Sequence, residues 1–571
     1  MIKGVNAENG IYPVTGNPFV DTGQAVIACL AGKESFTKMN HDDVKRVFGG
    51  NDLSDWNSRL KSFTMVFGNN GPLYQPRGKK FEETRKRKYR SILSGLLSQI
   101  ENVNRDSGMC ECCGEFHAVD INAAYEQVDD DKGNDHVVGR DLFPLIGSLG
   151  SDAQALPSSS RMFNICPRCL FAVAYIPIGT RLLSGKLMVF EGAHQPFVQD
   201  LIKSIIDDNR RLLSVGGNSI ETIGKKRHSS ETVKWLCTVF RELQHAQKIK
   251  ELPKNSELNI WLFSNSGTNP SCEIISIPDE SVRFLWDAAR YDLENEIASL
   301  ATVDKSIKNS DNHLLNSIRN KIDYMGLYPI KKYDGASVSM FAFYQTRLLG
   351  VPYKTLVASQ KLAEGLLPDN TKEQKEWIKS DVFKDIKKRN ILKGRIIEMV
   401  EDGRLSIDDY FHIFPVKSLY PLQASFKGFD MTRYFLRHVD EDIHNYEYKS
   451  IEGESVKMNP NILEAADLYF NDYIENRGLK RFKKDVLDEF KSGTKHVYWI
   501  KNVMCDLSER HEGFGPDDWD SFWHDLCHDE TGNFVGYELL FQMRLALTDL
   551  YRKKMQENIT MNPEINQTGG N

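Results

Sequence analysis

The sequence lacks several features that would place it in a common class. Its longest apolar runs, such as LFAVAYI at 170–176, are about half as long as a membrane span requires. The opening residues, MIKGVNAENG, hold no apolar stretch of the kind that forms the centre of a secretory signal. These absences predict a cytoplasmic protein without a membrane partner, in which cysteines are normally reduced.

The common signatures of catalysis are missing too. The chain has no Walker A loop, no dinucleotide fingerprint and no GxSxG motif. His524 and His528 are four residues apart, as in helical metal sites, but the glutamate of HExxH motifs is absent. We therefore expect a protein that is not an enzyme. The alternative is a metal-dependent nuclease that uses His524 and His528.

An excess of positive charge is also lacking. The 571 residues include 73 Lys and Arg against 79 Asp and Glu, a net charge of −6. That balance argues against a simple nucleic-acid coat protein but allows a local basic groove. The length exceeds that of one ordinary core, so we expect at least two domains.

What the sequence does have is two pairs of closely spaced cysteines. Cys110 and Cys113 lie in MCECCGE, and Cys166 and Cys169 lie in ICPRCL. A two-residue spacing lets both thiolates of a turn bind one ion, and two such pairs complete a tetrahedron. Four thiolates leave no coordination position open, so the expected cofactor is a structural zinc ion.

Other interpretations of the cysteines remain open. A thioredoxin-like centre needs only one CxxC motif, and a disulfide network conflicts with a reducing compartment. Cys112 makes the register of the first pair ambiguous, and His117 could replace one sulfur. We take the four cysteines with two-residue spacing as the ligands and Cys112 as a non-ligand.

The N-terminal part of the sequence mixes helix and strand signals. Asp21 and Gln24 have the spacing of a capping box before an apolar helix that ends near Gly32. Apolar runs bounded by turn residues predict strands at 170–179, 186–192 and 258–267.

After Pro368, where Thr371 and Gln374 form another capping-box pair, amphipathic segments dominate. In YELLFQMRLALTDLYRKKM (537–555), apolar residues recur every three or four positions, at Leu540, Met543, Leu547 and Leu550. The expected fold class is therefore α+β. It comprises a mixed region over 1–368 with a zinc clasp at 110–169, a helical bundle over 369–556 and a disordered tail over 557–571.

One strongly basic segment, RGKKFEETRKRKYR at 77–90, stands out from the acidic chain. A solvated helix face is the common role of such runs, but phosphate contacts to DNA or RNA are the interpretation that we prefer. Amide side chains just before it could read base edges. The expected nucleic-acid-binding residues are Asn69, Asn70, Gln75, Lys79, Lys80, Arg85, Lys86, Arg87 and Lys88.

Several stretches together resemble a known family. GNPFVDTG, CECC, FPLIGSLGSDAQALP, CPRC and NIWLFSNSG occur in this order over roughly residues 10–270. They are similar to the CXXC–CXXC family of large subunits of type I-B CRISPR interference complexes (Cascade). Cys112 is a departure from the family pattern.

The resemblance implies a non-catalytic role in antiviral defence. Such subunits sit beside the crRNA 5′ handle among the other Cascade subunits and recognise the protospacer-adjacent motif (PAM) on double-stranded target DNA. They help to open the duplex and present the displaced strand to a separately encoded helicase–nuclease. The resemblance also implies that the C-terminal bundle, which is similar to small subunits, is made separately in related systems. Met399 or Met431 would be the start of such a product.

Overall fold

The computed structural model describes most of the chain. The described residues are 12–50, 53–68, 71–74, 82–102, 108–115, 117–125, 136–146, 163–183, 185–215, 228–245, 251–265, 270–303, 314–329, 334–366, 386–413, 426–438, 443, 458, 460–488, 509 and 536–561. The chain divides into two compact units, Met1–Ile322 and Asp323–Asn571.

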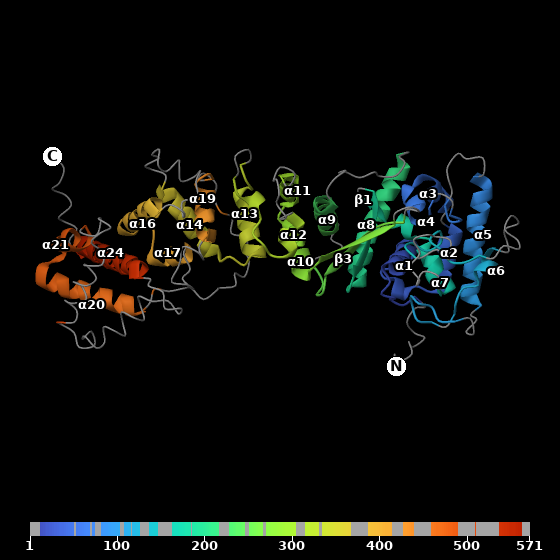
Figure 1. Cartoon of the computed structure of the whole chain (residues 1–571), viewed down its shortest axis with the longest axis horizontal. Coiled ribbons are helices and arrows are strands. Elements are labelled where there is room, and N and C mark those ends of the chain that lie inside the picture. Colours follow the sequence, from blue (N-terminus) through green and yellow to red (C-terminus); the bar gives the residue numbers. More distant parts are fainter. Residues whose placement is uncertain are drawn as a thin grey trace. The chain divides into compact units, whose positions relative to one another are not determined.

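Unit 1 contains a four-stranded antiparallel sheet in the order β1-β2-β3-β4 (Figure 1). Its strands are β1 Arg181–Leu183, β2 Lys186–Gly192, β3 Leu258–Ser264 and β4 Ser271–Ile277. In the register, Val189 of β2 pairs with Trp261 of β3, which pairs with Ile274 of β4. The strands expected at 186–192 and 258–267 are confirmed, the second of them as far as Ser264.

Helices make up most of the other residues of unit 1 that the structure describes. Those before the sheet are α1 Pro18–Ala31, α2 His41–Gly50, α3 Leu53–Arg59, α4 Lys61–Phe67, α5 Glu82–Glu101, α6 Ile121–Tyr125 and α7 Pro167–Val173. The later ones are α8 Gln195–Ser214, α9 His228–His245, α10 Asp279–Arg290, α11 Glu294–Val303 and α12 Leu314–Arg319. Both α1 and α8 pack against β2.

The first helix begins earlier than the capping-box pattern predicts. Asn17 is the N-cap, and its side chain accepts hydrogen bonds from the backbone N–H groups of Phe19 and Val20. Asp21 lies one turn inside the helix, where it accepts hydrogen bonds from Thr15 and Gly16. The C-terminal end is as expected, because Gly32 adopts the left-handed conformation with φ 72°.

The strand expected at 170–179 is wrong. These residues form the end of α7 and a 3₁₀ turn at Ile176–Ile178. Cys166 caps the helix and Pro167 occupies its first turn, a favourable combination for helix initiation. The sequence pattern predicts a strand because every residue from 170 to 176 is fully buried. No polar face therefore indicates the helical period.

The described residues of unit 2 form a helical array, as expected for its C-terminal part. The helices are α13 Val338–Phe343, α14 Tyr353–Leu366, α16 Ile386–Glu401, α17 Ile407–Ile413, α19 Phe426–Phe435, α20 Pro460–Arg477, α21 Leu479–Phe482 and α24 Gly536–Met561. Single π-helical turns follow α13 and α21, at Tyr344–Leu348 and Lys483–Leu487. With the sheet of unit 1, this arrangement confirms the mixed fold class.

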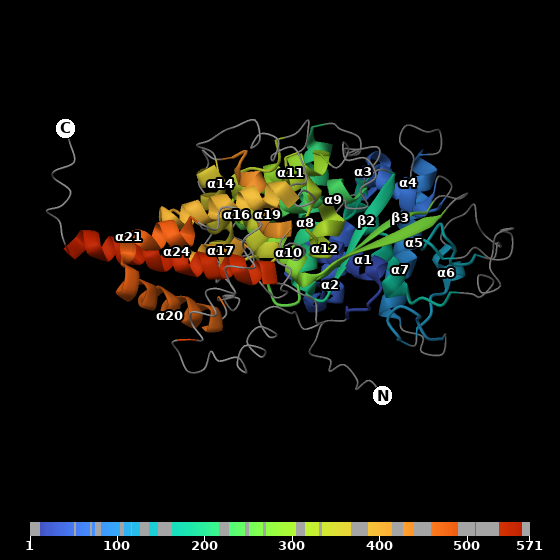
Figure 2. The same cartoon turned by 60° about the vertical axis from the view of Figure 1, so that its left-hand side comes forward.

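The core of unit 2 gathers around α24, which packs against α16 and α20 (Figure 2). Met543 and Leu547 are buried, and Leu550 is partly buried against the same core, as the sequence pattern predicts. The side chain of Leu540 lies outside the described residues. The helix continues to Met561, five residues beyond the expected end of the bundle at 556.

The expected domain boundary at 368 stays a prediction. Helix α14 ends at Leu366, and residues 367–385 lie outside the described part of the chain, together with Thr371 and Gln374. Within the described part, no helix combines the length and the apolar character that a membrane crossing demands.

Candidate metal centre

The first cysteine pair lies on a tight turn. Residues 111–113 form the turn, and the Gly114 N–H donates to the Cys110 carbonyl over 2.9 Å. Gly114 has φ 75°, a backbone conformation that favours glycine. The Cys110 N–H donates to the Glu115 carbonyl over 2.7 Å, which closes the turn. This turn brings Cys110 and Cys113 to the same side.

The second pair lies at the start of α7. The Cys166 sulfur caps the helix by accepting the backbone N–H of Cys169 over 3.4 Å. Cys166 and Cys169 are both buried. Helix α7 itself packs between α1 and α5, so two helices of unit 1 fix the position of this pair.

Backbone hydrogen bonds align the two segments. The Glu111 N–H donates to the Asn164 carbonyl over 2.8 Å, and the Asn164 N–H donates to the Glu111 carboxylate over 3.1 Å. Beyond the turn, the Val119 N–H donates to the Ile165 carbonyl over 2.8 Å. Hydrogen bonds therefore connect the segment before α7 to the first cysteine turn and to the residues that follow that turn.

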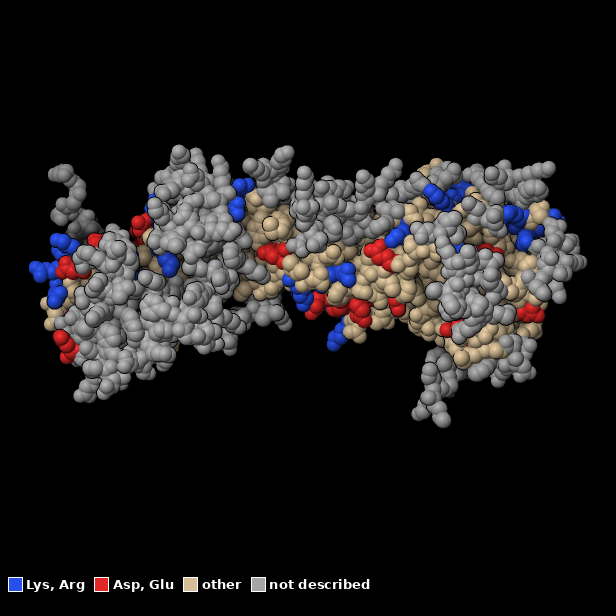
Figure 3. All heavy atoms as spheres, viewed as in Figure 1, with Lys and Arg blue, Asp and Glu red and all other residues tan. Residues whose placement is uncertain are grey.

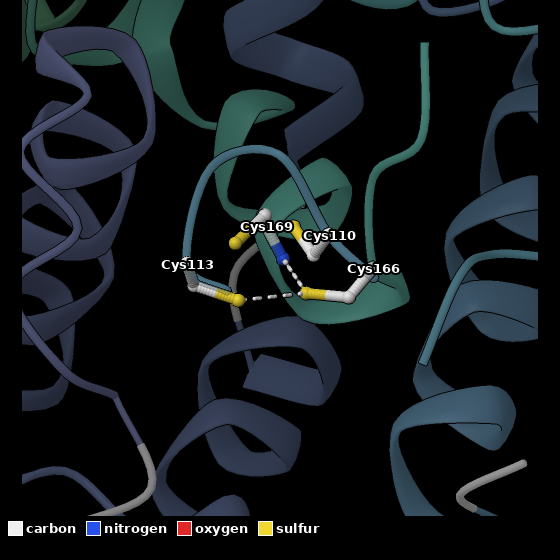
Figure 4. Close-up of side chains that lie close together, drawn as sticks. All are labelled: Cys110, Cys113, Cys166 and Cys169. Carbon is white, nitrogen blue, oxygen red and sulfur yellow. Dashed lines mark hydrogen bonds between the residues drawn. The ribbon is translucent and has the colours of Figure 1, made fainter. Parts of the chain in front are cut away.

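The four sulfur atoms meet in one place (Figure 4). The Sγ atoms of Cys110, Cys113, Cys166 and Cys169 all lie within 4.8 Å of one another, and those of Cys113 and Cys166 are 3.6 Å apart. A tetrahedral ion with metal–sulfur bonds of 2.3 Å separates its sulfurs by about 3.8 Å. The four-cysteine centre, as we call this group, therefore has the geometry to hold a metal ion.

Two residues that made the ligand set ambiguous lie outside this group. Cys112 is half-buried on the same turn, and His117 is buried two residues beyond Glu115. Burial lowers the pKa of His117 and so favours its neutral form. The four sulfurs come together without either residue.

The electrostatics of the centre favour a cation. Hydrogen bonds from the thiols of Cys112 and Cys113 lower the pKa of Cys110 far below its usual range. Hydrogen bonds with Cys110 and Cys113 raise the pKa of Cys166. Without a cation the group thus retains protons, because adjacent thiolates repel one another. A bound divalent ion would allow all four sulfurs to ionise.

A buried arginine beside the centre was missed by the sequence analysis. Arg168, between the cysteines of CPRC, forms an ion pair with Glu115 at 2.6 Å and points an N–H at the Cys113 sulfur, 3.8 Å away. Its guanidinium lies 5.7 Å from the centre of the Tyr12 ring. Arg168 is only 9% exposed. A basic residue inside a CxxC pair is the sequence signal that could have indicated this role. The burial of Arg168 is seen only in the structure.

The expected nucleic-acid contacts are partly described. Helix α5 carries Arg85, Lys86, Arg87 and Lys88, and basic side chains are visible at the end of unit 1 that holds α5 (Figure 3). Arg85 donates to the carbonyls of Gly71 and Tyr74, and Lys88 lies over the Tyr125 ring. Arg87 is exposed and Lys86 half-exposed. The remaining expected positions, Asn69, Asn70, Gln75, Lys79, Lys80, His524 and His528, lie outside the described residues.

Comparison with known proteins gives a match to a protein family. No curated protein and no solved structure matches the chain significantly. Residues 104–181 match the model of a family described as CRISPR-associated protein (Cas_CXXC_CXXC). All four cysteines of the centre and the whole of α7 fall within this range. The four-cysteine centre thus lies in a segment similar to a CRISPR-associated family, which indicates a CRISPR-associated role for the protein.

Proposed function

We propose that this protein is a non-catalytic large subunit of a type I-B crRNA-guided surveillance complex of CRISPR antiviral defence. The observation that carries the proposal is the family match over 104–181, whose two cysteine pairs converge to within 4.8 Å. In this role the chain acts in the cytoplasm with crRNA and the other Cascade subunits, binds double-stranded target DNA, and supports recruitment of a helicase–nuclease.

The cofactor in this proposal is one structural zinc ion held by Cys110, Cys113, Cys166 and Cys169. Zinc bound to four thiolates keeps no water ligand, so it supplies structure and does not supply a nucleophile. The protein's part is to hold the turn at 111–113 against the start of α7. Binding of the zinc ion then contributes directly to the folding free energy of unit 1.

The proposed PAM reader is the segment before α5, with Asn69, Asn70 and Gln75 contacting base edges. Lys79, Lys80, Lys86, Arg87 and Lys88 would contact phosphates. One described contact supports this division, because Arg85 holds residues 71–74 beside the basic helix through two carbonyl groups. Guide pairing supplies most sequence specificity in such complexes, so a short reading loop is sufficient.

The proposal is tested by assembling the complex with crRNA, with and without this chain. Affinity is measured for DNA duplexes that share the guide-matched sequence and differ only in the PAM. We expect PAM discrimination to require this chain. Equal discrimination by the complex that lacks it would contradict the proposal.

Purified protein incubated with labelled DNA and divalent metal should leave the DNA intact. Cleavage that is lost in a His524→Ala, His528→Ala double variant would instead identify a nuclease. No described residue favours that alternative, because His524 and His528 lie outside the described part of the chain.

A further inference from the structure

We infer that Arg168 is a positioning residue that sets the metal affinity of the four-cysteine centre. The inference rests on the metal site of the proposed function and goes beyond it by assigning a role to a residue that is not a ligand. Three contacts of Arg168 carry the inference: with a ligand sulfur, with a carboxylate and with an aromatic ring.

The charge of the metal-bound centre favours a cation beside it. A divalent ion with four thiolates has a net charge of −2, and the centre that holds it is largely buried. A buried net charge is unfavourable unless an opposite charge is close to it. Arg168 supplies that charge, with its Nη2 atom 3.8 Å from the Cys113 sulfur. Arginine keeps its proton at any ordinary pH, so this contribution does not depend on titration.

Two further groups orient the guanidinium of Arg168. Glu115, which follows the first cysteine turn, binds the same Nη2 atom of Arg168 at 2.6 Å. The Tyr12 ring lies 5.7 Å from the guanidinium carbon, within the range of a cation–π contact. A planar guanidinium can serve a carboxylate, a sulfur and an aromatic face together, which an ammonium group cannot do as well.

Removal of Arg168 should act mainly on the metal-bound form of the centre. Glu115 is half-exposed, with 51% of its side chain accessible, so water can solvate it when Arg168 is removed. Three of the four cysteines are buried and Cys113 is half-buried, so water compensates their sulfurs less. Loss of Arg168 should therefore destabilise the metal-bound form more than the metal-free form, and so lower the metal affinity. Residues next to metal ligands typically change metal affinity about 10- to 100-fold when they are replaced.

The test uses the full chain and competition with a chromophoric zinc chelator. Arg168→Met, which keeps an unbranched apolar stem but lacks the charged guanidinium, should raise the zinc dissociation constant about 10- to 100-fold. Arg168→Lys should restore part of the affinity because it restores the charge. Glu115→Gln is the matched control: it removes the ion pair but leaves Arg168 charged, so zinc affinity should change much less.

Two further readouts separate this role from a purely structural one. Cobalt substituted for zinc should show a thiolate-to-metal absorption band that shifts in Arg168→Met and not in Glu115→Gln. The melting temperature of the metal-free protein should change little in Arg168→Met. Added zinc should raise the melting temperature of this variant by less than that of the wild type.

Zinc affinity equal to wild type in Arg168→Met, or equal losses in Arg168→Met and Glu115→Gln, would overturn the inference and leave the metal site standing. A wild-type chain that binds neither zinc nor cobalt would overturn both.

Discussion

Gly23 on α1 lies against Ala172 on α7 so closely that a Cβ atom at position 23 would overlap the Ala172 carbonyl oxygen. The atoms that occupy the space beside Gly23 belong to the backbone, which cannot move aside as a flexible side chain can. Because α7 carries Cys169 and is capped by Cys166, this contact also fixes one half of the four-cysteine centre.

Gly23→Ala should therefore destabilise unit 1. Overpacking of a close contact commonly costs about 1–3 kcal/mol, and here the clash is with a main-chain carbonyl. Chemical denaturation in the presence of zinc measures the change. Gly49→Ala is the control, because Gly49 is exposed on α2 and has open space around its Cα. That change should stabilise the helix by up to about 1 kcal/mol. Equal effects at the two positions would contradict the close contact.

Removing any one ligand should open the metal centre. We expect one zinc per chain in the native protein and loss of tight binding in single serine variants of Cys110, Cys113, Cys166 and Cys169. Cys112→Ser should retain the metal, because the other four sulfurs come together without it. Elemental analysis and thermal denaturation provide the measurements. Full zinc retention in a Cys166/Cys169 double serine variant would show that the second pair supplies no essential ligand.

The exposed basic residues of α5 should contribute affinity without sequence preference. Lys86→Ala with Arg87→Ala should weaken target binding by a similar factor for every PAM variant. Each lost phosphate contact should also reduce the slope of log affinity against log salt by about 0.9 on duplex DNA. Affinity of the assembled complex at several salt concentrations gives both quantities. An unchanged slope and affinity would mean that these side chains form only a solvated helix face.

Arg85 should behave differently from its neighbours. It donates to the carbonyls of Gly71 and Tyr74, so Arg85→Ala should release the loop that we propose reads the PAM. Discrimination among PAM variants should fall by more than the affinity for the best one. Arg85→Lys, which loses the guanidinium fork, should show an intermediate loss. Preserved discrimination in Arg85→Ala would place the reader elsewhere in the chain.

Phe482 should be a principal contributor to the stability of unit 2. It is fully buried, and its ring centre lies 4.8 Å from that of Phe470 and 5.3 Å from that of Tyr473. Phe482→Ala should cost about 3–5 kcal/mol, because it leaves a cavity among aromatic rings. Lys480→Ala, on the exposed side of the same short helix, should change stability by less than about 0.5 kcal/mol. Denaturation followed by circular dichroism compares the two, and similar losses would contradict the packing.

Some parts of this architecture can be predicted from the sequence because the patterns that predict them are local. The CxxC spacing predicts a shared site for four sulfurs, and the structure brings those sulfurs together. Apolar runs bounded by turn residues locate β2 and β3, and periodic apolar residues locate α24. Each of these predictions depends on residues within one turn or one strand, or on a chemical rule that does not require knowledge of the fold.

Other parts depend on tertiary contacts that sequence does not show. The run at 170–176 has no polar residue to reveal its period, because α1 and α5 cover α7 on two sides. Asp21 looks like an N-cap, but Asn17 takes that place and Asp21 binds the preceding loop. Arg168 resembles any surface arginine until its burial against Glu115 and Tyr12 is known.

The separation of the two cysteine pairs has a consequence during protein synthesis. Cys113 and Cys166 are 53 positions apart, and a ribosome adds about 5–20 residues per second. The first pair therefore leaves the ribosome about 3–11 s before the second, and in that interval two thiols cannot complete the coordination of a tetrahedral ion. Helix α7, which completes the centre, is also the helix against which α1 and α5 pack. Until Cys169 has emerged, the first cysteine pair therefore lacks its partner ligands, and the faces of α1 and α5 that pack on α7 stay uncovered.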